Sequence, residues 1–200
     1  MSLRLEMLQV ARVAPKALED ASDLVRDFLL SQQHPDGGFC DRDGESDLYY
    51  TVFGLNALAA FQVEPDMNAV EKFLLKFEEG EGLDLVHLSC LCRCWGTLGQ
   101  KRMPKGLRKV LLNRLEAFRK PCGGWDNNPE REHGTAYGSF LALGAYQDLG
   151  KLPPKPFRIL QSLKYLETPD HAWNNHPNLP VGSTNPTAGA VVLLNNLHLP

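Results

Sequence analysis

The sequence contains no uninterrupted apolar run close to the roughly 20 residues that a transmembrane helix needs, so we expect no membrane span. Its first residues carry Arg4 and Glu6 among scattered apolar residues and lack the compact apolar stretch of a secretory signal. The 5 cysteines are odd in number and show no paired spacing, which argues against a disulfide framework. Together these absences predict a cytoplasmic protein with reduced thiols.

A strong excess of one charge is also missing. The formal net charge is −3, so no basic field favours binding to nucleic acid. No Ser-His-Asp order, phosphate-binding glycine loop or paired-carboxylate motif stands out, and the catalytic residues, if any, stay unknown. The composition, 43% hydrophobic and 22% charged, is that of an ordinary globular protein, and the length suits a single domain over residues 1–200.

Three segments of the chain resemble one another. Each contains an amphipathic helix, a turn that ends in an aromatic residue, and a second helix that opens with threonine. They comprise 28–39 with 51–58, 115–125 with 135–143, and 163–173 with 187–194. The separation between Thr51 and Thr135 is about twice the roughly 40-residue period of helical-hairpin repeats. A degenerate unit over 66–99 therefore fits between the first two.

The turns indicate how the units stack. The paired glycines Gly37-Gly38 and Gly123-Gly124 permit positive φ and end the first helix sharply. We expect the aromatic residues that close the three turns, Phe39, Trp125 and Trp173, to be buried at equivalent places between neighbouring hairpins.

These patterns predict an all-α fold, an α/α-toroid-like array of about four helical hairpins. Their approximate bounds are 15–63, 66–99, 104–150 and 155–198. The second helices are rich in glycine and alanine, which lets helices approach closely, so we expect them to form an inner layer and the charged first helices an outer one. Because no hairpin can bury its apolar face alone, the hairpins must stack, as an open crescent or a closed ring.

The Gln32–Phe39 turn with the following Thr-x-x-x-Leu helix, and the Gly123-Gly124-Trp125 turn, resemble a known repeat. It is the one shared by protein prenyltransferase β subunits and squalene-type terpene cyclases, and the likeness covers about residues 20–197. The resemblance implies an α/α toroid that binds an isoprenoid, or another apolar ligand, in its concave inner face. It also implies prenyltransferase-like chemistry, if the chain is an enzyme.

The catalytic signatures of those families are absent or displaced. The Asp-x-Asp-Asp acid of the cyclases is missing, and Asp41-Arg42-Asp43 is the nearest string. The β subunits bind Zn²⁺ through an Asp-x-Cys pair and a histidine that opens another inner helix. Here Cys90 has no such aspartate, and His133 lies one residue too early. Whether the chain catalyses a reaction stays open.

Two groups of residues are candidates for a site. His87, Cys90 and Cys94 share one face of a helix and, with His133, are suited to Zn²⁺; the alternative, which we prefer, is that the thiols only pack and no cofactor is bound. The second group consists of aromatic residues on or beside inner helices. As ligand-binding residues they would line an apolar pocket, and otherwise they fill the core. They are Tyr49, Tyr50, Trp95 and Tyr137.

A basic stretch, Lys101–Lys109, could meet a diphosphate head group at the mouth of such a pocket, or it is a solvated outer face. Three functions follow from the sequence. The first is an isoprenoid-binding relative of the prenyltransferases. The second is a non-catalytic helical scaffold for protein–protein interaction. The third is a partial toroid that a partner subunit or a second copy completes.

Overall fold

A computed structural model describes residues 2–197, so the last residue of the expected fourth hairpin, residue 198, lies outside the described part of the chain. Helices account for more than half of the chain, and the sheet has two strands, β1 (Phe39–Cys40) and β2 (Ser46–Asp47), which confirms the all-α prediction. The helices are α1 (Leu3–Ala11), α2 (Ala14–Leu18), α3 (Ala21–Ser31), α4 (Leu48–Ala60), α5 (Met67–Leu75), α6 (Leu85–Leu98), α7 (Leu107–Ala117), α8 (Ala136–Asp148), α9 (Phe157–Lys164) and α10 (Thr184–Asn196). No helix among the described residues is long and apolar enough to cross a membrane.

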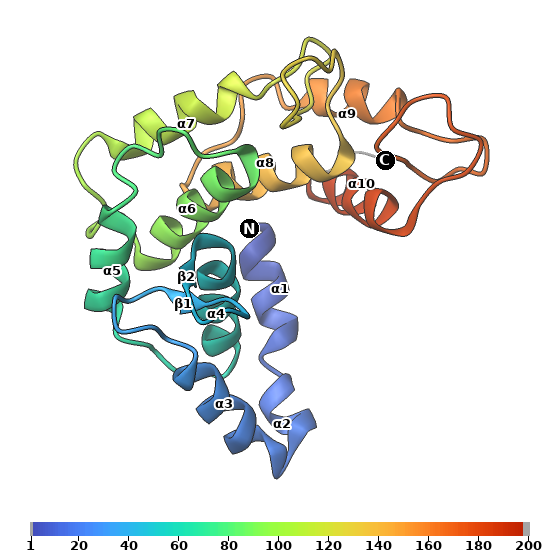
Figure 1. Cartoon of the computed structure of the whole chain (residues 1–200). Helices are drawn as coiled ribbons and strands as arrows, with labels where there is room; N and C mark the ends of the chain where they lie inside the picture. Colours follow the sequence, from blue (N-terminus) through green and yellow to red (C-terminus); the bar gives the residue numbers. More distant parts are fainter. Residues whose placement is uncertain (1, 198–200) are drawn as a thin grey trace.

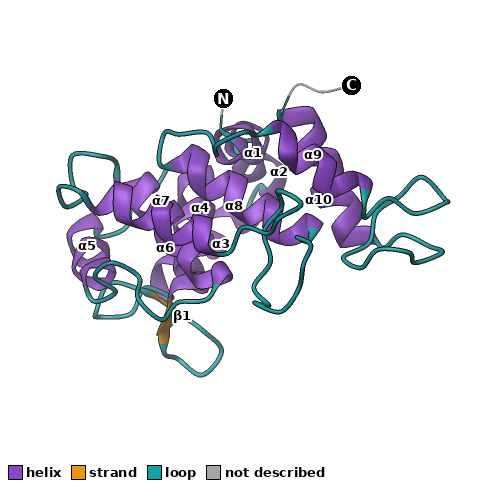
Figure 2. Ribbon diagram, turned by 90° about the horizontal axis from the view of Figure 1, so that it is seen from above, coloured by secondary structure: helices purple, strands orange, loops and turns teal. Residues whose placement is uncertain are grey.

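Helices α4, α6, α8 and α10 pack side by side in chain order, each against the next. Figures 1 and 2 show these helices in the middle of an open arc, with α5, α7 and α9 along its convex side. The helix pairs α3–α4, α5–α6, α7–α8 and α9–α10 fall within the four ranges expected from the sequence. The second helix of each pair is the inner one.

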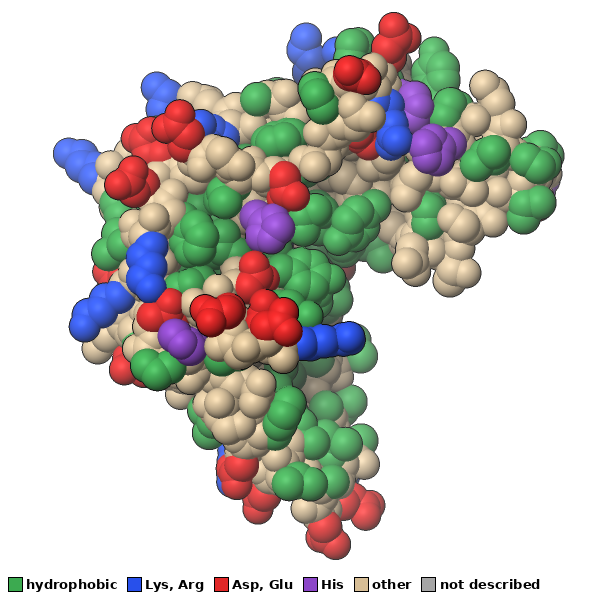
Figure 3. Space-filling view, in the orientation of Figure 1, with side chains coloured by type: hydrophobic (Ala, Val, Ile, Leu, Met, Phe, Trp, Pro, Cys, Tyr) green, Lys and Arg blue, Asp and Glu red, His purple; other side chains and the backbone are tan. Residues whose placement is uncertain are grey.

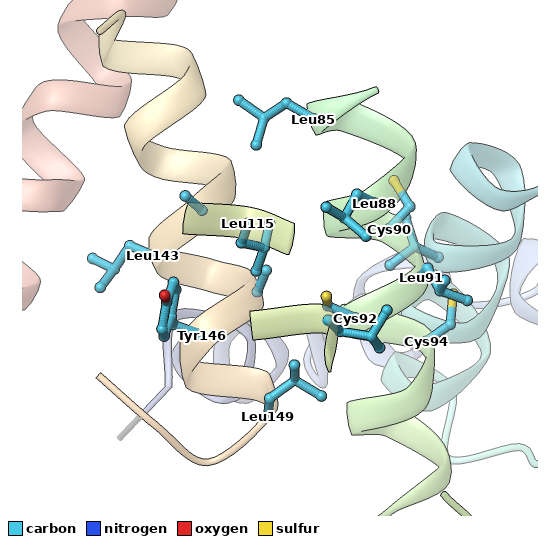
Figure 4. Close-up of a cluster of buried hydrophobic side chains, with 14 of the residues drawn as sticks. Leu85, Leu88, Cys90, Leu91, Cys92, Cys94, Leu115, Leu143, Tyr146 and Leu149 are labelled. Carbon is cyan, nitrogen blue, oxygen red and sulfur yellow. The ribbon is translucent and has the colours of Figure 1, made fainter. Parts of the chain in front are cut away.

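Small residues allow the inner helices to approach closely. A Cβ atom on Gly96 of α6 would lie 2.5 Å from the carbonyl oxygen of Asp148 at the end of α8, a distance that real Cβ atoms do not tolerate. Around this contact, leucine and cysteine side chains of α6 pack with those of α7 and α8, including Leu115 and Tyr146 (Figure 4). The inner helices are therefore part of a filled core.

The three aromatic turns share one hydrogen-bond geometry. The backbone N–H of each aromatic residue donates to a hydroxyl oxygen of the following inner helix: Phe39 to Thr51, Trp125 to Ser139 and Trp173 to Thr187, at 2.9, 3.2 and 3.0 Å. The sequence match of Thr51 with Thr135 was therefore wrong by one helical turn. Thr135 instead caps the N-terminus of α8. A hydroxyl is all that the contact requires, so serine replaces threonine there.

Only the first glycine of each pair has positive φ: Gly37 and Gly123 have φ of +102° and +105°. The second glycines, Gly38 and Gly124, have no room for a Cβ atom, because it would clash with a side chain of the next outer helix. Phe39 and Trp125 are buried, as expected, but Trp173 is only partly buried. The turns of Phe39 and Trp125 pack against α5 and α9, and no further outer helix covers the turn of Trp173 within residues 2–197.

Helix α1, which was not predicted from the sequence, packs against α4 and α8. The backbone N–H of Leu3 donates to Gln147 at 2.9 Å, and Arg4 pairs with Asp148 at 3.2 Å. One small pocket between α1 and helices α6 and α8 has a volume of about 10 Å³. Helix α1 therefore fills the part of the inner face that lies near the C-terminal end of α8.

Candidate functional site

Exposed aromatic side chains gather near the N-terminal ends of α4 and α8. Tyr49 and Tyr50 are each 37% exposed, and Phe53, one turn further along α4, is 52% exposed. The ring of Tyr49 makes edge-to-face contacts with both neighbours, at centroid distances of 5.9 Å to Tyr50 and 4.9 Å to Phe53. Tyr137, in the first turn of α8, is 41% exposed. We call these four residues the aromatic face.

The two halves of the aromatic face lie close together across the start of α6. Burial raises the pKa of Tyr137, and the nearby hydroxyl of Tyr49 raises it further, so the two phenol groups lie within electrostatic range of each other. Figure 3 shows hydrophobic side chains in the hollow of the arc, with acidic side chains and a histidine beside them. The aromatic face therefore combines solvent-exposed side chains of α4 and α8.

Trp95, the fourth residue expected to bind a ligand, does not belong to this face. It is fully buried in the core, and its indole N–H finds no acceptor among the described residues. Helix α6 is flanked by α4 and α8 and is also contacted by α5 and α7, so little of it beyond its first turn is free. The aromatic type of Trp95 was visible in the sequence, but the side of the helix that reaches solvent was not.

Acidic residues border the aromatic face. Asp47 and Asp84 are the N-caps of α4 and α6, and each accepts hydrogen bonds from backbone N–H groups of its helix. The imidazole of His87 lies between them, with Nδ1 2.8 Å from Asp84 and Nε2 3.6 Å from Asp47. Burial acts to raise the pKa of Asp84, but hydrogen bonds from the backbone and ring of His87 outweigh it and lower the pKa. Asp84 thus stays charged at neutral pH.

The loop that leads into α4 adds to this negative charge. Residues 41–47 carry four carboxylates, on Asp41, Asp43, Glu45 and Asp47, against the single cation of Arg42. Asp41 accepts the backbone N–H groups of Asp43 and Glu45, which fixes the loop in a tight turn. The entrance to the aromatic face from this side is therefore acidic.

The zinc candidates do not converge. Cys90 and Cys94 are 2% and 0% exposed and point into the core (Figure 4), where burial raises the pKa of Cys90 to about 12 and disfavours the thiolate that a metal needs. His87 is held by the two aspartates, and His133 lines a pocket beside α9. Among the described residues, no group of three or more His, Cys, Asp or Glu side chains is placed to hold a metal ion.

The basic stretch lies away from the aromatic face. Lys101–Lys109 follows the C-terminal end of α6, whereas His87 and the tyrosines lie at helix N-termini, so the 14 residues of α6, about 21 Å of helix, separate them. Arg102 instead binds Glu71 of α5 at 2.7 Å. A diphosphate on the aromatic face would not reach these cations.

Phe53 of the aromatic face and the aspartates that border it were not predicted from the sequence. Phe53 follows Tyr49 by four residues, a spacing that puts both on one side of a helix, and this signal was available. No sequence signal indicated that Asp47 and Asp84 both contact His87, because this arrangement depends on the N-termini of two helices lying close together.

Comparisons of the sequence with protein-family models and with curated proteins find no match. The aromatic face, its acidic border and the filled inner surface behind it are therefore the features from which a function is inferred.

Proposed function

We propose that the chain is a non-catalytic helical scaffold whose aromatic face binds a partner polypeptide. The observation that carries this proposal is the exposure of four neighbouring aromatic side chains, between 37% and 52%, on a folded protein. Tyrosine and phenylalanine are enriched at protein interfaces, and tyrosine is among the residues that contribute most binding energy. Contiguous exposed apolar surface is typical of interaction sites.

The charge around the aromatic face favours a basic partner segment. Asp47, Asp84 and the acidic loop of residues 41–45 would attract lysine and arginine side chains and increase the rate of association. The same carboxylates would repel a diphosphate. A segment with apolar side chains on one side and basic ones on the other fits both features.

The proposed arrangement is an open, α/α-toroid-like arc, and the resemblance to prenyltransferase β subunits and squalene-type cyclases is carried over only to this repeat. Isoprenoid binding, the competing function, requires an apolar cavity behind the tyrosines. Near the C-terminal end of α8, the pocket between α1 and helices α6 and α8 has a volume of only about 10 Å³, which leaves no room there for an isoprenoid chain that extends from the tyrosines along the inner face. Completion by a further subunit remains compatible with the scaffold function.

A peptide titration tests the proposal. The probes are an amphipathic helical peptide of leucine and lysine and its charge-reversed counterpart of leucine and glutamate, each with a fluorescent label, measured by anisotropy. We expect micromolar binding of the lysine peptide and at least about tenfold weaker binding of the glutamate peptide. The Tyr137→Ala variant should lose about tenfold in affinity for the lysine peptide, as a tyrosine at the centre of an interface does.

Tyr165→Ala is the matched control, because Tyr165 is 66% exposed but belongs to α9's C-cap rather than to the aromatic face. It should bind like the unmodified chain. Equal affinity for both peptides, or binding that Tyr137→Ala leaves unchanged, would contradict the proposal. Farnesyl diphosphate is titrated in parallel, and micromolar binding that Tyr137→Ala weakens would favour the isoprenoid function instead.

A further inference from the structure

A pocket of about 930 Å³ opens between the third hairpin's aromatic turn and α9, and its lining shares no residue with the aromatic face. Cys122, Glu132 and His133 line it from the loop before α8, and Arg158, Lys164 and Tyr165 line it from α9 and its C-cap. The volume falls in the range of small-molecule sites. None of these residues contributes to the proposed partner surface.

The corresponding place beside the first turn is filled. There the ring of Phe73 on α5 packs against Gly38, and Lys76 forms an ion pair with Asp36 at 2.7 Å. In the turn of Trp125 the equivalent glycine, Gly124, faces the small side chain of Ser162. Cys122 stands where the first turn has Asp36, three residues before the aromatic residue. The ring and the cross-linking ion pair of the first turn thus have no counterpart at Ser162 and Cys122, and the pocket lies beside Cys122.

The pocket has cations without carboxylate partners. Among the described residues, neither Arg158 nor Lys164 forms an ion pair, and the guanidinium of Arg158 donates a hydrogen bond to the backbone carbonyl of Pro121. Glu132, the single carboxylate of the lining, also has no ion-pair partner in this part of the chain. Two cationic side chains thus face one carboxylate in the lining, and the imidazole of His133 and the phenol hydroxyl of Tyr165 lie beside them.

We propose that this pocket binds a small organic phosphate. Arg158 and Lys164 would hold the phosphate oxygens through charge-assisted hydrogen bonds, as unpaired guanidinium and ammonium groups do. The ring of Tyr165 and the side chain of Pro121 provide apolar surface for the organic part. Affinity should therefore require both the phosphate and the group attached to it.

Protection of Cys122 from alkylation tests the proposal. Cys122 and Cys40 are the partly exposed cysteines of the chain, while Cys90, Cys92 and Cys94 are buried, so iodoacetamide followed by peptide mass spectrometry resolves Cys122 from an internal control. The probe is phenyl phosphate, with inorganic phosphate and phenol as its two halves. We expect phenyl phosphate to slow alkylation of Cys122 at least about threefold when bound at more than two-thirds occupancy, and to leave Cys40 unchanged.

Lys164→Gln is the binding variant, and Lys105→Gln, which removes an exposed cation from the loop before α7, is its charge-matched control. Lys164→Gln should raise the phenyl phosphate concentration needed for half-maximal protection about tenfold, whereas Lys105→Gln should leave it unchanged. Protection by phenol alone, equal effects of the two variants, or no protection below about 10 mM phenyl phosphate would each overturn the proposal. Protection by inorganic phosphate at the same concentrations would overturn the role of the organic part.

Discussion

At the scale of single residues, position in the array determines what an aromatic side chain does. Trp125 is fully buried, its indole N–H donates to the carbonyl of Leu115 at 2.9 Å, and the guanidinium of Arg119 lies 4.5 Å from the ring centroid. Tyr49 and Tyr137 are of similar chemical character but remain exposed, because they lie on the free side of inner helices. Residue type alone does not distinguish these roles.

Replacing Trp125 with alanine should destabilise the protein by about 3–5 kcal/mol, the cost of deleting a large buried aromatic side chain. The lost hydrogen bond and the cavity beneath Arg119 contribute to this cost. Urea unfolding monitored by circular dichroism measures it. Trp173→Ala is the control, because Trp173 is only partly buried and its indole N–H finds no acceptor among residues 2–197, and it should cost about 1–2 kcal/mol. A loss under about 1 kcal/mol for Trp125→Ala would show that the residue is not a core plug.

At the scale of elements, the same turn recurs with different residues. Antiparallel bridges pair the aromatic residue with the residue six positions earlier in all three turns. The position after Asp36, Cys122 and Asp170 has positive φ each time, but the third turn has His171 there, at φ +58°, instead of glycine. Backbone geometry is therefore conserved between turns more closely than sequence.

His171→Gly should stabilise the protein by about 0.5–1 kcal/mol. A Cβ atom in the left-handed region costs about 1–2 kcal/mol, and the greater unfolded-state freedom of glycine offsets part of the gain. The imidazole is 90% exposed, so its removal loses little packing. His171→Ala keeps the Cβ atom and should not be stabilised. Thermal unfolding of both variants compares them, and equal midpoints would contradict strain at this position.

At the scale of the whole molecule, α1 joins distant parts of the array. The carboxylate of Asp148, 1% exposed at the end of α8, lies 3.2 Å from Arg4 of α1 and 3.4 Å from Arg93 of α6. Helix α1 and two adjacent inner helices, α6 and α8, thus meet at one buried charge. This contact holds α1 on the inner face. The aromatic face lies on a part of the inner helices that α1 does not cover.

Asp148→Ala should release α1. Removing one partner leaves two arginines, each about 15% exposed, without a counter-ion, which costs about 3–5 kcal/mol for buried pairs. Hydrogen exchange should show loss of protection in α1 with α6 and α8 retained. The control, Asp23→Ala, removes the carboxylate of the exposed Asp23–Arg26 pair and should leave α1 protected. Undiminished protection of α1 in Asp148→Ala would mean that apolar contacts alone hold it.

The sequence by itself determined the local elements. Apolar periodicity and helix-ending glycines predicted the helix pairs, and the aromatic turns predicted two of three buried plugs, because capping, φ preference and amphipathicity act between residues close in the chain. Tyr49, Tyr50 and Tyr137 were also singled out from sequence, although their binding role stays a prediction.

Only the tertiary structure decided which surfaces are free. Trp95 is in the core, the basic stretch lies at the far end of α6, and α1 fills part of the inner face. Each of these outcomes depends on which elements from distant parts of the chain pack together, and burial is a property of those pairings. A helix carries the same side chains whichever neighbour covers it, so its sequence specifies a face but not what the face meets.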